Sequence, residues 1–337
     1  MKNRKTYIVF VIFFLALSSL LHFRKEATPD FTFVERIEGS NTSSEWQNAK
    51  VTIQGMLTEL QKKSGQPKTK LKLALAYINE SRITGKHAYY DAAALSLLHR
   101  IPQADKNYFD VKCAIATIQL SQHHFSEALQ TGNLLIQQNP HSAFAFGVLT
   151  DAHLESGNYE AAIKAADQMV ALRPDIRSYA RVAYLREVTG DILGAIEIMK
   201  MAVAAGIPGL EQTEWCRYQL GKLFESVGDI ESANDIYVQS LQIRKNYPYA
   251  LAGLASIATH KQNYSDAIRL YTQAKSFTDD YSFTENLYEL YTLAKQPTNA
   301  AQAQVECLKM LGANSGDESE NFMVIMLIKN WLSFIAS

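Results

Sequence analysis

A short turn recurs along this chain at a nearly constant interval, and that interval constrains the fold more than any other feature of the sequence. The clearest copy reads GNYEAA and ends in Ala162. The alanines that close successive copies lie 34, 33, 38, 34 and 34 residues apart. A fixed period of this length predicts stacked copies of one supersecondary unit. The other copies are HHFSEA (123–128), GDILGA (190–195), GDIESA (228–233), QNYSDA (262–267) and QPTNAA (296–301), which end in Ala128, Ala195, Ala233, Ala267 and Ala301.

Each unit is predicted to consist of two helices around this turn. Apolar residues recur at i, i+3 and i+4 spacing on both sides of the turn, which is typical of helices with one buried face. Pro140 and Pro174 end the second helix of two units. A hairpin this small cannot bury its apolar face alone, so neighbouring units must stack on it. In the unit around Ala162, the buried faces are predicted to contain Phe146, Leu149, Thr150 and His153 on the first helix, and Tyr159, Ala162, Ile163, Ala166, Met169 and Val170 on the second.

These residues resemble the tetratricopeptide repeat. The best match is the unit with Leu220-Gly221, Phe224, Ala233 and Tyr237, and a second unit matches through Leu149, Ala162 and Pro174. The resemblance implies an all-α, right-handed α-solenoid of stacked helix-turn-helix repeats. Five units extend over 109–281, and two more divergent ones lie at about 69–105 and 282–315. In the divergent copies the glycine and the tyrosine of the family pattern are replaced by other residues.

One interval of 38 residues breaks the repeat. The extra residues lie at Ala205–Glu211, where Gly206 and Gly209 surround Pro208. Such a sequence predicts a longer loop between two units. The loop is either a tolerated insertion or a device that changes the local pitch or shapes a site.

The resemblance also implies where a partner binds. In that family the first helices line a concave groove, and their outward residues contact an extended peptide or a partner helix. Large aromatic residues recur among the corresponding positions here, and aromatic residues with arginine are typical interface anchors. Packing between units is the alternative role for several of them, Trp215 in particular. Of the family's two-carboxylate clamp only Lys222 is present, so a chaperone-tail adaptor is not expected. The candidate partner-binding residues are Asp151, Arg177, Tyr184, Trp215, Tyr218, Lys222 and Tyr249.

The ends of the chain differ from the repeats. Residues 1–23 combine a basic start with an uncharged run from Thr6 to Phe23, which predicts a membrane anchor or a cleaved signal segment. The segments that follow are interpreted as a polar linker over 24–45, a leading helix over 46–68 and repeats over 69–315. Residues 316–337 begin with the polar GDESE and are apolar almost all round from Asn321 onward, which predicts a C-terminal helix that caps the last unit, docks on a membrane or partner, or mediates self-association.

Composition excludes several classes of function. Residues 1–25 carry five basic side chains and no acid, so the remainder holds 28 Lys and Arg against 34 Asp and Glu. An acidic body lacks the basic surface that a nucleic-acid binder needs. Three scattered cysteines predict buried thiols rather than disulfides or zinc, and no nucleotide-binding, hydrolase or metal motif is present. We therefore expect no catalytic residues, cofactor or metal.

The sequence as a whole favours a membrane-tethered scaffold or adaptor without catalysis of its own, with its body in the periplasm. Two alternatives stay open: an exported accessory protein that binds a glycan or small ligand in the groove, and an assembly element of an envelope complex.

Overall fold

The computed structural model describes residues 33–36, 44–62, 66–105 and 108–314. The chain divides into two compact units, residues 1–34 and 35–337, and every helix described belongs to the second. The described residues form helices and turns without a strand, which confirms the predicted all-α fold for this part of the chain. The helices are α2 (Ser44–Lys62), α3 (Pro67–Thr84), α4 (His87–Leu98), α5 (Tyr108–Ser121), α6 (Phe125–Gln138), α7 (Ala143–Glu155), α8 (Tyr159–Leu172), α9 (Ile176–Val188), α10 (Ile192–Ala205), α11 (Glu211–Ser226), α12 (Ile230–Ile243), α13 (Pro248–His260), α14 (Tyr264–Lys275), α15 (Tyr281–Leu293) and α16 (Pro297–Asn314).

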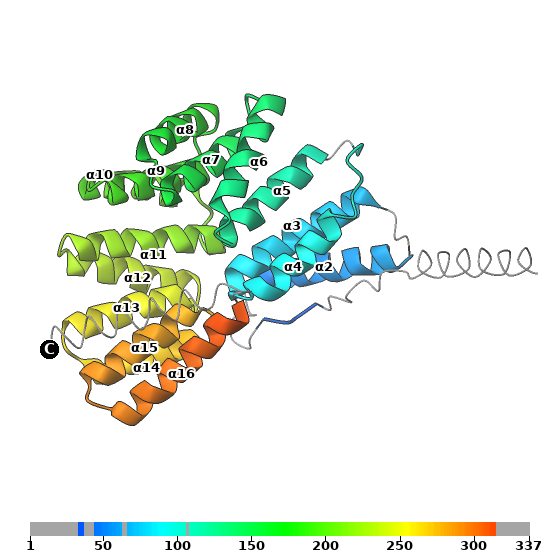
Figure 1. The fold of residues 1–337 in the computed structure, drawn as a ribbon. Helices are drawn as coiled ribbons and strands as arrows, with labels where there is room; N and C mark the ends of the chain where they lie inside the picture. The colour runs from blue at the N-terminus through cyan, green and yellow to red at the C-terminus, as the bar shows by residue number, and fades with distance from the viewer. Residues whose placement is uncertain (1–32, 37–43, 63–65, 106–107, 315–337) are drawn as a thin grey trace, which may run out of the picture. The chain divides into compact units, whose positions relative to one another are not determined.

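From α5 onward the helices form consecutive hairpins. A first helix (odd-numbered, α5 to α15) packs against the second helix that follows it (even-numbered, α6 to α16), as Figure 1 shows. Each second helix also packs against the first helix of the next hairpin. Helices α3 and α4 form a further hairpin ahead of this series. The stack of helical hairpins predicted from the repeat is therefore present.

The turns inside the six hairpins from α5/α6 to α15/α16 share one backbone geometry. The first residue of each turn has a positive φ, between 56° and 88°. The amide of the next residue donates to the carbonyl five positions earlier, as Asn158 does to His153 at 2.8 Å, which is the Schellman pattern that ends many helices. Glycine adopts this conformation without strain. The positive-φ residues are His123, Gly157, Gly190, Gly228, Gln262 and Lys295.

The alanines that close the turns lie where two helices approach each other most closely. Ala128, Ala162, Ala195, Ala233 and Ala267 are completely buried. The prediction of Ala301 for the last hairpin is wrong. Ala300 is the buried residue there and Ala301 is exposed, because the turn begins at Lys295 and Ala300 follows it at the same spacing as in the other hairpins.

Two glycines of the repeat make room for a buried tyrosine. Tyr237 on α12 is completely buried, and its ring lies against Gly221 on α11 and Gly253 on α13. A β-carbon at either glycine would collide with the ring. The Tyr237 hydroxyl donates to Glu225 Oε1 at 2.6 Å, so the polar end of this side chain has a partner.

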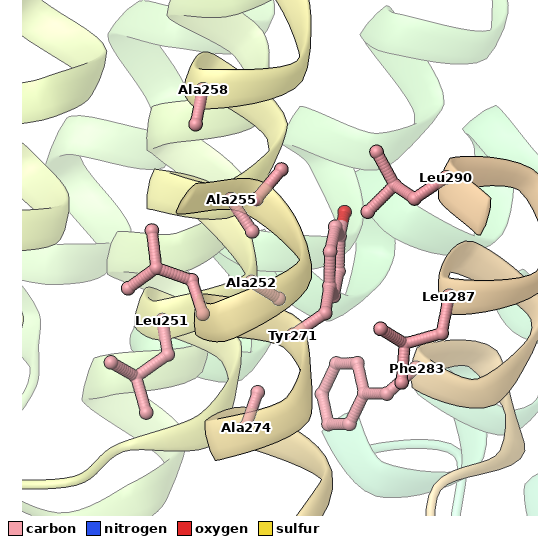
Figure 2. Close-up of a cluster of buried hydrophobic side chains, with 11 residues drawn as sticks. Leu251, Ala252, Ala255, Ala258, Tyr271, Ala274, Phe283, Leu287 and Leu290 are labelled. Atoms are coloured by element: carbon pink, nitrogen blue, oxygen red, sulfur yellow. The ribbon is translucent and has the colours of Figure 1, made fainter. Parts of the chain in front are cut away.

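A neighbouring cluster shows how small and large side chains alternate between hairpins. Figure 2 shows Tyr271 of α14 between the small side chains of α13 and the larger ones of α15. Alternation of this kind fills the space between helices without voids. The cluster around Tyr271 includes Ala252, Ala255 and Ala258 on α13, and Phe283, Leu287 and Leu290 on α15.

The break in the repeat is divided between a loop and a helix. The loop before α11 has five residues, Gly206–Leu210, where the loop before α9 has three. Helix α11 has 16 residues, whereas α9 has 13. The first turn of α11 brings two carboxylates into the interior, because Glu211 is 3% exposed and Glu214 is fully buried. Glu214 Oε1 accepts from the Gly209 amide at 2.9 Å and so fastens the loop to the helix.

Buried ion pairs join the N-terminal part of the second unit to these inserted residues. Arg36 is 4% exposed and donates to both carboxylate oxygens of Glu80 on α3, at 2.7 and 2.8 Å. Glu45 on α2 accepts from Arg244 Nη1, at the end of α12, at 2.7 Å. Glu211 pairs with Arg82 at 2.5 Å. Glu45 also accepts from the Glu211 amide at 3.4 Å, so it contacts residues 166 and 199 positions further along the chain.

The end of α3 meets a second distant segment. The Thr84 carbonyl accepts from the Asp279 amide and from the Thr278 hydroxyl, each at 3.1 Å. Lys86 pairs with Asp279 at 3.3 Å. The first hairpin is therefore held against the loop that joins α14 to α15, 194 residues further along the chain.

The predictions for the two ends of the chain are only partly covered by the described residues. Residues 1–23 and 316–337, assigned to an anchor or signal and to a C-terminal helix, lie outside the described residues. Within the described part no helix is both long and apolar enough to span a bilayer. The polar segment 24–45 is not wholly a solvated linker, since Arg36 within it is buried against Glu80. Helix α2 runs from Ser44 to Lys62 and α3 begins at Pro67.

Candidate binding surface

The candidate binding residues all lie on first helices. Because these residues recur at i, i+3 and i+7 spacing, each helix presents its set on one face. In the structure three of the seven residues form a half-buried aromatic cluster, three are exposed and one is held in an ion pair. Asp151 lies on α7, Arg177 and Tyr184 on α9, Trp215, Tyr218 and Lys222 on α11, and Tyr249 on α13.

Three of the candidates form an aromatic cluster across α11 and α13. The rings of Trp215 and Tyr249 meet edge to face with centroids 4.8 Å apart. Tyr218 lies 5.5 Å from each of them. Phe283 on α15 extends the cluster, with its ring 5.4 Å from that of Tyr249. Edge-to-face and tilted pairs at these distances are attractive beyond the area they bury.

Polar groups border this cluster. The Tyr249 hydroxyl donates to Asp280 Oδ2 at 2.9 Å, and burial raises the pKa of Tyr249 well above its ordinary value, with the Asp280 carboxylate adding to the effect. Burial likewise raises the pKa of Tyr218, so both phenols stay protonated at physiological pH. The ammonium of Lys222 lies 5.8 Å from the centre of the Tyr218 ring. The surface therefore combines aromatic edges with one exposed cation.

Asp151 is already paired. Its two carboxylate oxygens accept from Nε and Nη2 of Arg181, at 2.8 and 2.7 Å, in a bidentate ion pair between α7 and α9. Arg181 Nη1 also donates to the Arg177 carbonyl at 3.3 Å. A carboxylate held in this way links two neighbouring first helices and is not free for a partner.

Tyr184, Arg177 and Lys222 are the exposed members of the set. The side chain of Tyr184 is 44% exposed. Burial and the nearby Glu155 carboxylate raise the pKa of Tyr184, which therefore remains a neutral phenol. Arg177 and Lys222 are exposed as well.

Sequence reasoning missed the residues that complete these groups. Arg181 lies four positions after Arg177 on the same face of α9, so helical spacing alone would have placed it beside the candidates. Asp280 and Phe283 lie at the start of α15, in the unit that matches the repeat pattern poorly, and no comparable signal marks them. The structure thus brings Trp215, Tyr218 and Tyr249 together and assigns Asp151 to an ion pair.

Nucleophilic and metal-ligating side chains do not gather on this surface. Within the described residues no group of three or more His, Cys, Asp or Glu side chains is placed to hold a metal ion. Cys216 and Cys307 are buried, Cys113 is half-buried, and none of the three forms a disulfide.

Comparisons with known proteins agree with the repeat. A profile of the tetratricopeptide repeat family matches residues 250–282, which contain most of α13 and all of α14. No curated protein matches the chain in sequence.

Solved structures share the fold at low sequence identity. A chain of the APC/C hetero-tetramer Cut9-Hcn1 is similar with a TM-score of 0.61 and 17% identity, over 86% of this chain and 54% of that one. This chain thus spans about half the length of that protein. Yeast Tom70 is similar with a TM-score of 0.53 and 13% identity, over 90% of this chain and 66% of that one. PilW, described as a type IV pilus biogenesis factor, gives 0.50 and 12%, over 65% of this chain and 100% of that one.

Proposed function

We propose that this chain, a tetratricopeptide-repeat protein, is a membrane-tethered scaffold or adaptor that binds another protein or an extended peptide through its first helices. The fold is one that typically presents a surface to partners rather than catalysing a reaction. Under this proposal the chain has no catalysis of its own. The similarity of its fold to a subunit of the Cut9-Hcn1 assembly is consistent with such a role.

The observation that carries the proposal is the distribution of side chains on α9, α11 and α13. A half-buried aromatic cluster provides rigid apolar contact area at small entropic cost, and exposed Tyr184, Arg177 and Lys222 lie on the same set of helices. Interface hot spots are enriched in Trp, Tyr and Arg, set among contacts of little energetic weight. The surface has these anchors.

The finer part of the proposal concerns location. Residues 1–23 would tether the body to a membrane and place it in the periplasm, and tethering would raise the local concentration of the scaffold near membrane partners. The printed description of PilW, a pilus biogenesis factor, is compatible with an envelope setting. Protease added to intact spheroplasts should digest the body, while the protein stays in the membrane fraction. Protection of the body, or release of the full chain in soluble form, would contradict this part of the proposal.

Capture of a partner from membranes tests the binding surface. The double variant Tyr184→Ala with Lys222→Ala should lower the recovered partner by about tenfold or more, because truncation of two anchors costs roughly 1 to 2 kcal/mol each. The matched control is Ile163→Ala with Lys164→Ala on the second helix α8. Ile163 is 44% exposed, as Tyr184 is, and Lys164 is exposed as Lys222 is.

Two outcomes would change the proposal. Equal capture by both double variants would remove the first helices as the binding surface. If the wild-type protein binds to a glycan array and no stoichiometric protein partner is recovered, the alternative hypothesis is favoured. The cluster of Trp215 and Tyr218 would then bind a glycan or small ligand.

A further inference from the structure

We propose that a cavity between the N-terminal helices and the inserted loop binds a small organic monocarboxylate with an apolar body. The cavity has a volume of about 480 Å³, a size typical of small-molecule sites. Its walls come from Arg36, from Glu45 at the start of α2, from the end of α3, from Ile207–Leu210 and from the segments after α12 and α14. It is thus distinct from the aromatic cluster on the first helices, and it does not depend on the function proposed there.

Basic side chains predominate among the charged groups of the wall. Among the residues that the structure describes, Arg36, Lys86, Arg244 and Lys245 line the cavity together with a single carboxylate, that of Glu45. The carboxylate of Glu45 accepts from Arg244, which neutralises its charge locally. An excess of positive charge in a partly enclosed space favours an anion.

The pairing of these cations indicates a single negative charge on the ligand. Arg36 is paired with Glu80, Arg244 with Glu45, and Lys86 with Asp279. Lys245 has no ion-pair partner in the part of the chain that the structure describes. One cation is therefore left over, which matches a monoanion better than a phosphate dianion.

Arg36 supplies a donor for such an anion. The nitrogens Nε and Nη2 donate to Glu80, but Nη1 is buried and has no hydrogen-bond partner among the described residues. Its nearest acidic oxygen is Glu45 Oε2, at 3.9 Å, beyond hydrogen-bonding distance. A buried guanidinium nitrogen without a partner is costly, and a carboxylate oxygen in the cavity would satisfy it.

Apolar side chains form much of the remaining wall, together with Thr84, Asn246, Tyr247 and Thr278. Ile207, Leu210 and Pro208 contribute from the inserted loop, and Phe277 from the segment after α14. Ile207 is 65% exposed and so leaves apolar surface open at the cavity. The residues that break the 34-residue repeat thus add apolar side chains to a cavity that also has cationic ones, and a carboxylate attached to an aliphatic or aromatic group fits both.

Such a carboxylate has two sources, a free organic acid or the C-terminus of a peptide. Titration calorimetry on the full-length protein in detergent separates them with three probes: octanoate, an acetylated tripeptide that ends in leucine with a free carboxylate, and the same peptide as its C-terminal amide. Binding of octanoate shows that a free acid is sufficient. Binding of the acid peptide without binding of octanoate shows that the ligand is the C-terminus of a peptide. The peptide amide should not bind in either case.

Variants of exposed cavity residues assign the site. Lys245→Glu should weaken the binding of the carboxylate probe by about tenfold, because it places a second charge of the ligand's sign at the wall. Lys261→Glu is the matched control, since Lys261 is an exposed lysine at the end of α13 and does not line the cavity. Ile207→Trp should reduce binding by filling the cavity while leaving its charge unchanged.

Three results would overturn the proposal. The first is that neither carboxylate binds up to about 10 mM, which corresponds to less than about 3 kcal/mol of binding free energy. The second is that Lys245→Glu and Lys261→Glu change the affinity equally. The third is that the peptide amide binds as tightly as the peptide acid.

Discussion

The hairpins from α5 to α10 and those from α11 to α14 have the same turn geometry but differ in their contacts. In the first group, here called the open units (Tyr108–Ala205), each helix packs against its own hairpin and the adjacent ones. In the second group, the bridged units (Glu211–Lys275), Glu211 and Arg244 also contact Arg82 and Glu45 from the N-terminal helices. The same repeat thus makes contacts with adjacent hairpins alone in the open units, whereas in the bridged units it also binds the N-terminal helices.

This difference has an energetic consequence. The stability of a repeat array is usually a sum of unit and nearest-neighbour terms, so any unit can open locally. Contacts between residues 166 to 199 positions apart couple the bridged units to α2, and the loop after α14 to the end of α3. Amide hydrogen exchange should therefore be slower in α11 to α13 than in α8 to α10.

The largest effect is expected from breaking the Arg36–Glu80 ion pair, because Arg36 also lies beside Glu45, which binds Arg244 in the bridged units. Arg36→Met leaves the buried Glu80 carboxylate without its partner, which should cost about 3 to 5 kcal/mol of unfolding free energy. Urea denaturation measures the loss, and hydrogen exchange should show that α11 to α13 lose their extra protection.

Two controls keep this interpretation testable. Arg186→Met removes an exposed ion pair with Asp191 in the open units and should cost roughly 0 to 1 kcal/mol. Replacing Arg36 and Glu80 together by Met should recover most of the loss, because an apolar pair can substitute for a buried ion pair. If Arg36→Met alone is as stable as the wild type, the Arg36–Glu80 pair does not couple the N-terminal helices to the bridged units.

A smaller effect is expected from three glycine-to-alanine changes. Gly253→Ala in the bridged units forces a methyl group into the Tyr237 ring and should cost about 1 to 3 kcal/mol. Gly147→Ala in the open units meets the flexible end of Met169, with the sulfur 3.2 Å from the new carbon, and should cost less.

Gly55 on α2 provides the control for helix propensity. A β-carbon there has no atom within 4 Å, so Gly55→Ala should raise stability by about 0.5 to 1 kcal/mol. Thermal unfolding of the three variants should give that order. The idea that Tyr237 packs tightly against α13 fails if Gly253→Ala is as stable as Gly55→Ala.

These regions also separate what a sequence can predict from what it cannot. The hairpin turns follow from local spacing, because the positive-φ residue, the cap and the closing alanine lie within six positions of one another. Two predictions from spacing were wrong: Ala301 was chosen for Ala300 in the turn that begins at Lys295, and Tyr159 and Ile163, predicted on the buried face of their helix, are 45% and 44% exposed. The Arg36–Glu80 pair and the contact of Thr84 with Asp279 join distant segments without a period, and no local pattern marks them.

The candidate binding residues illustrate the same limit. Their placement on first helices followed from register, yet only three-dimensional packing shows that Asp151 is occupied by Arg181 while Tyr184 is exposed. Whether they bind a partner stays a prediction.

The smallest expected effect concerns the rates at which two cysteines react. Burial raises the pKa of both Cys113 on α5 and Cys216 on α11 to about 12, so very little thiolate is present at pH 8 and labelling requires local opening. Cys113 is half-buried in the open units, whereas Cys216 is 1% exposed in the bridged units. Cys113 should therefore react first with a thiol reagent, as mass spectrometry of timed samples can show. In the Arg36→Met variant the rate at Cys216 should rise toward that at Cys113, because Arg36 Nη1 lies 3.9 Å from Glu45 Oε2 and its loss weakens the position from which Glu45 binds Arg244 and the Glu211 amide. If Cys216 reacts as fast as Cys113 in the wild-type protein, the contacts with the N-terminal helices add no local stability. The open and bridged units then differ in contacts but not in the free energy of local opening.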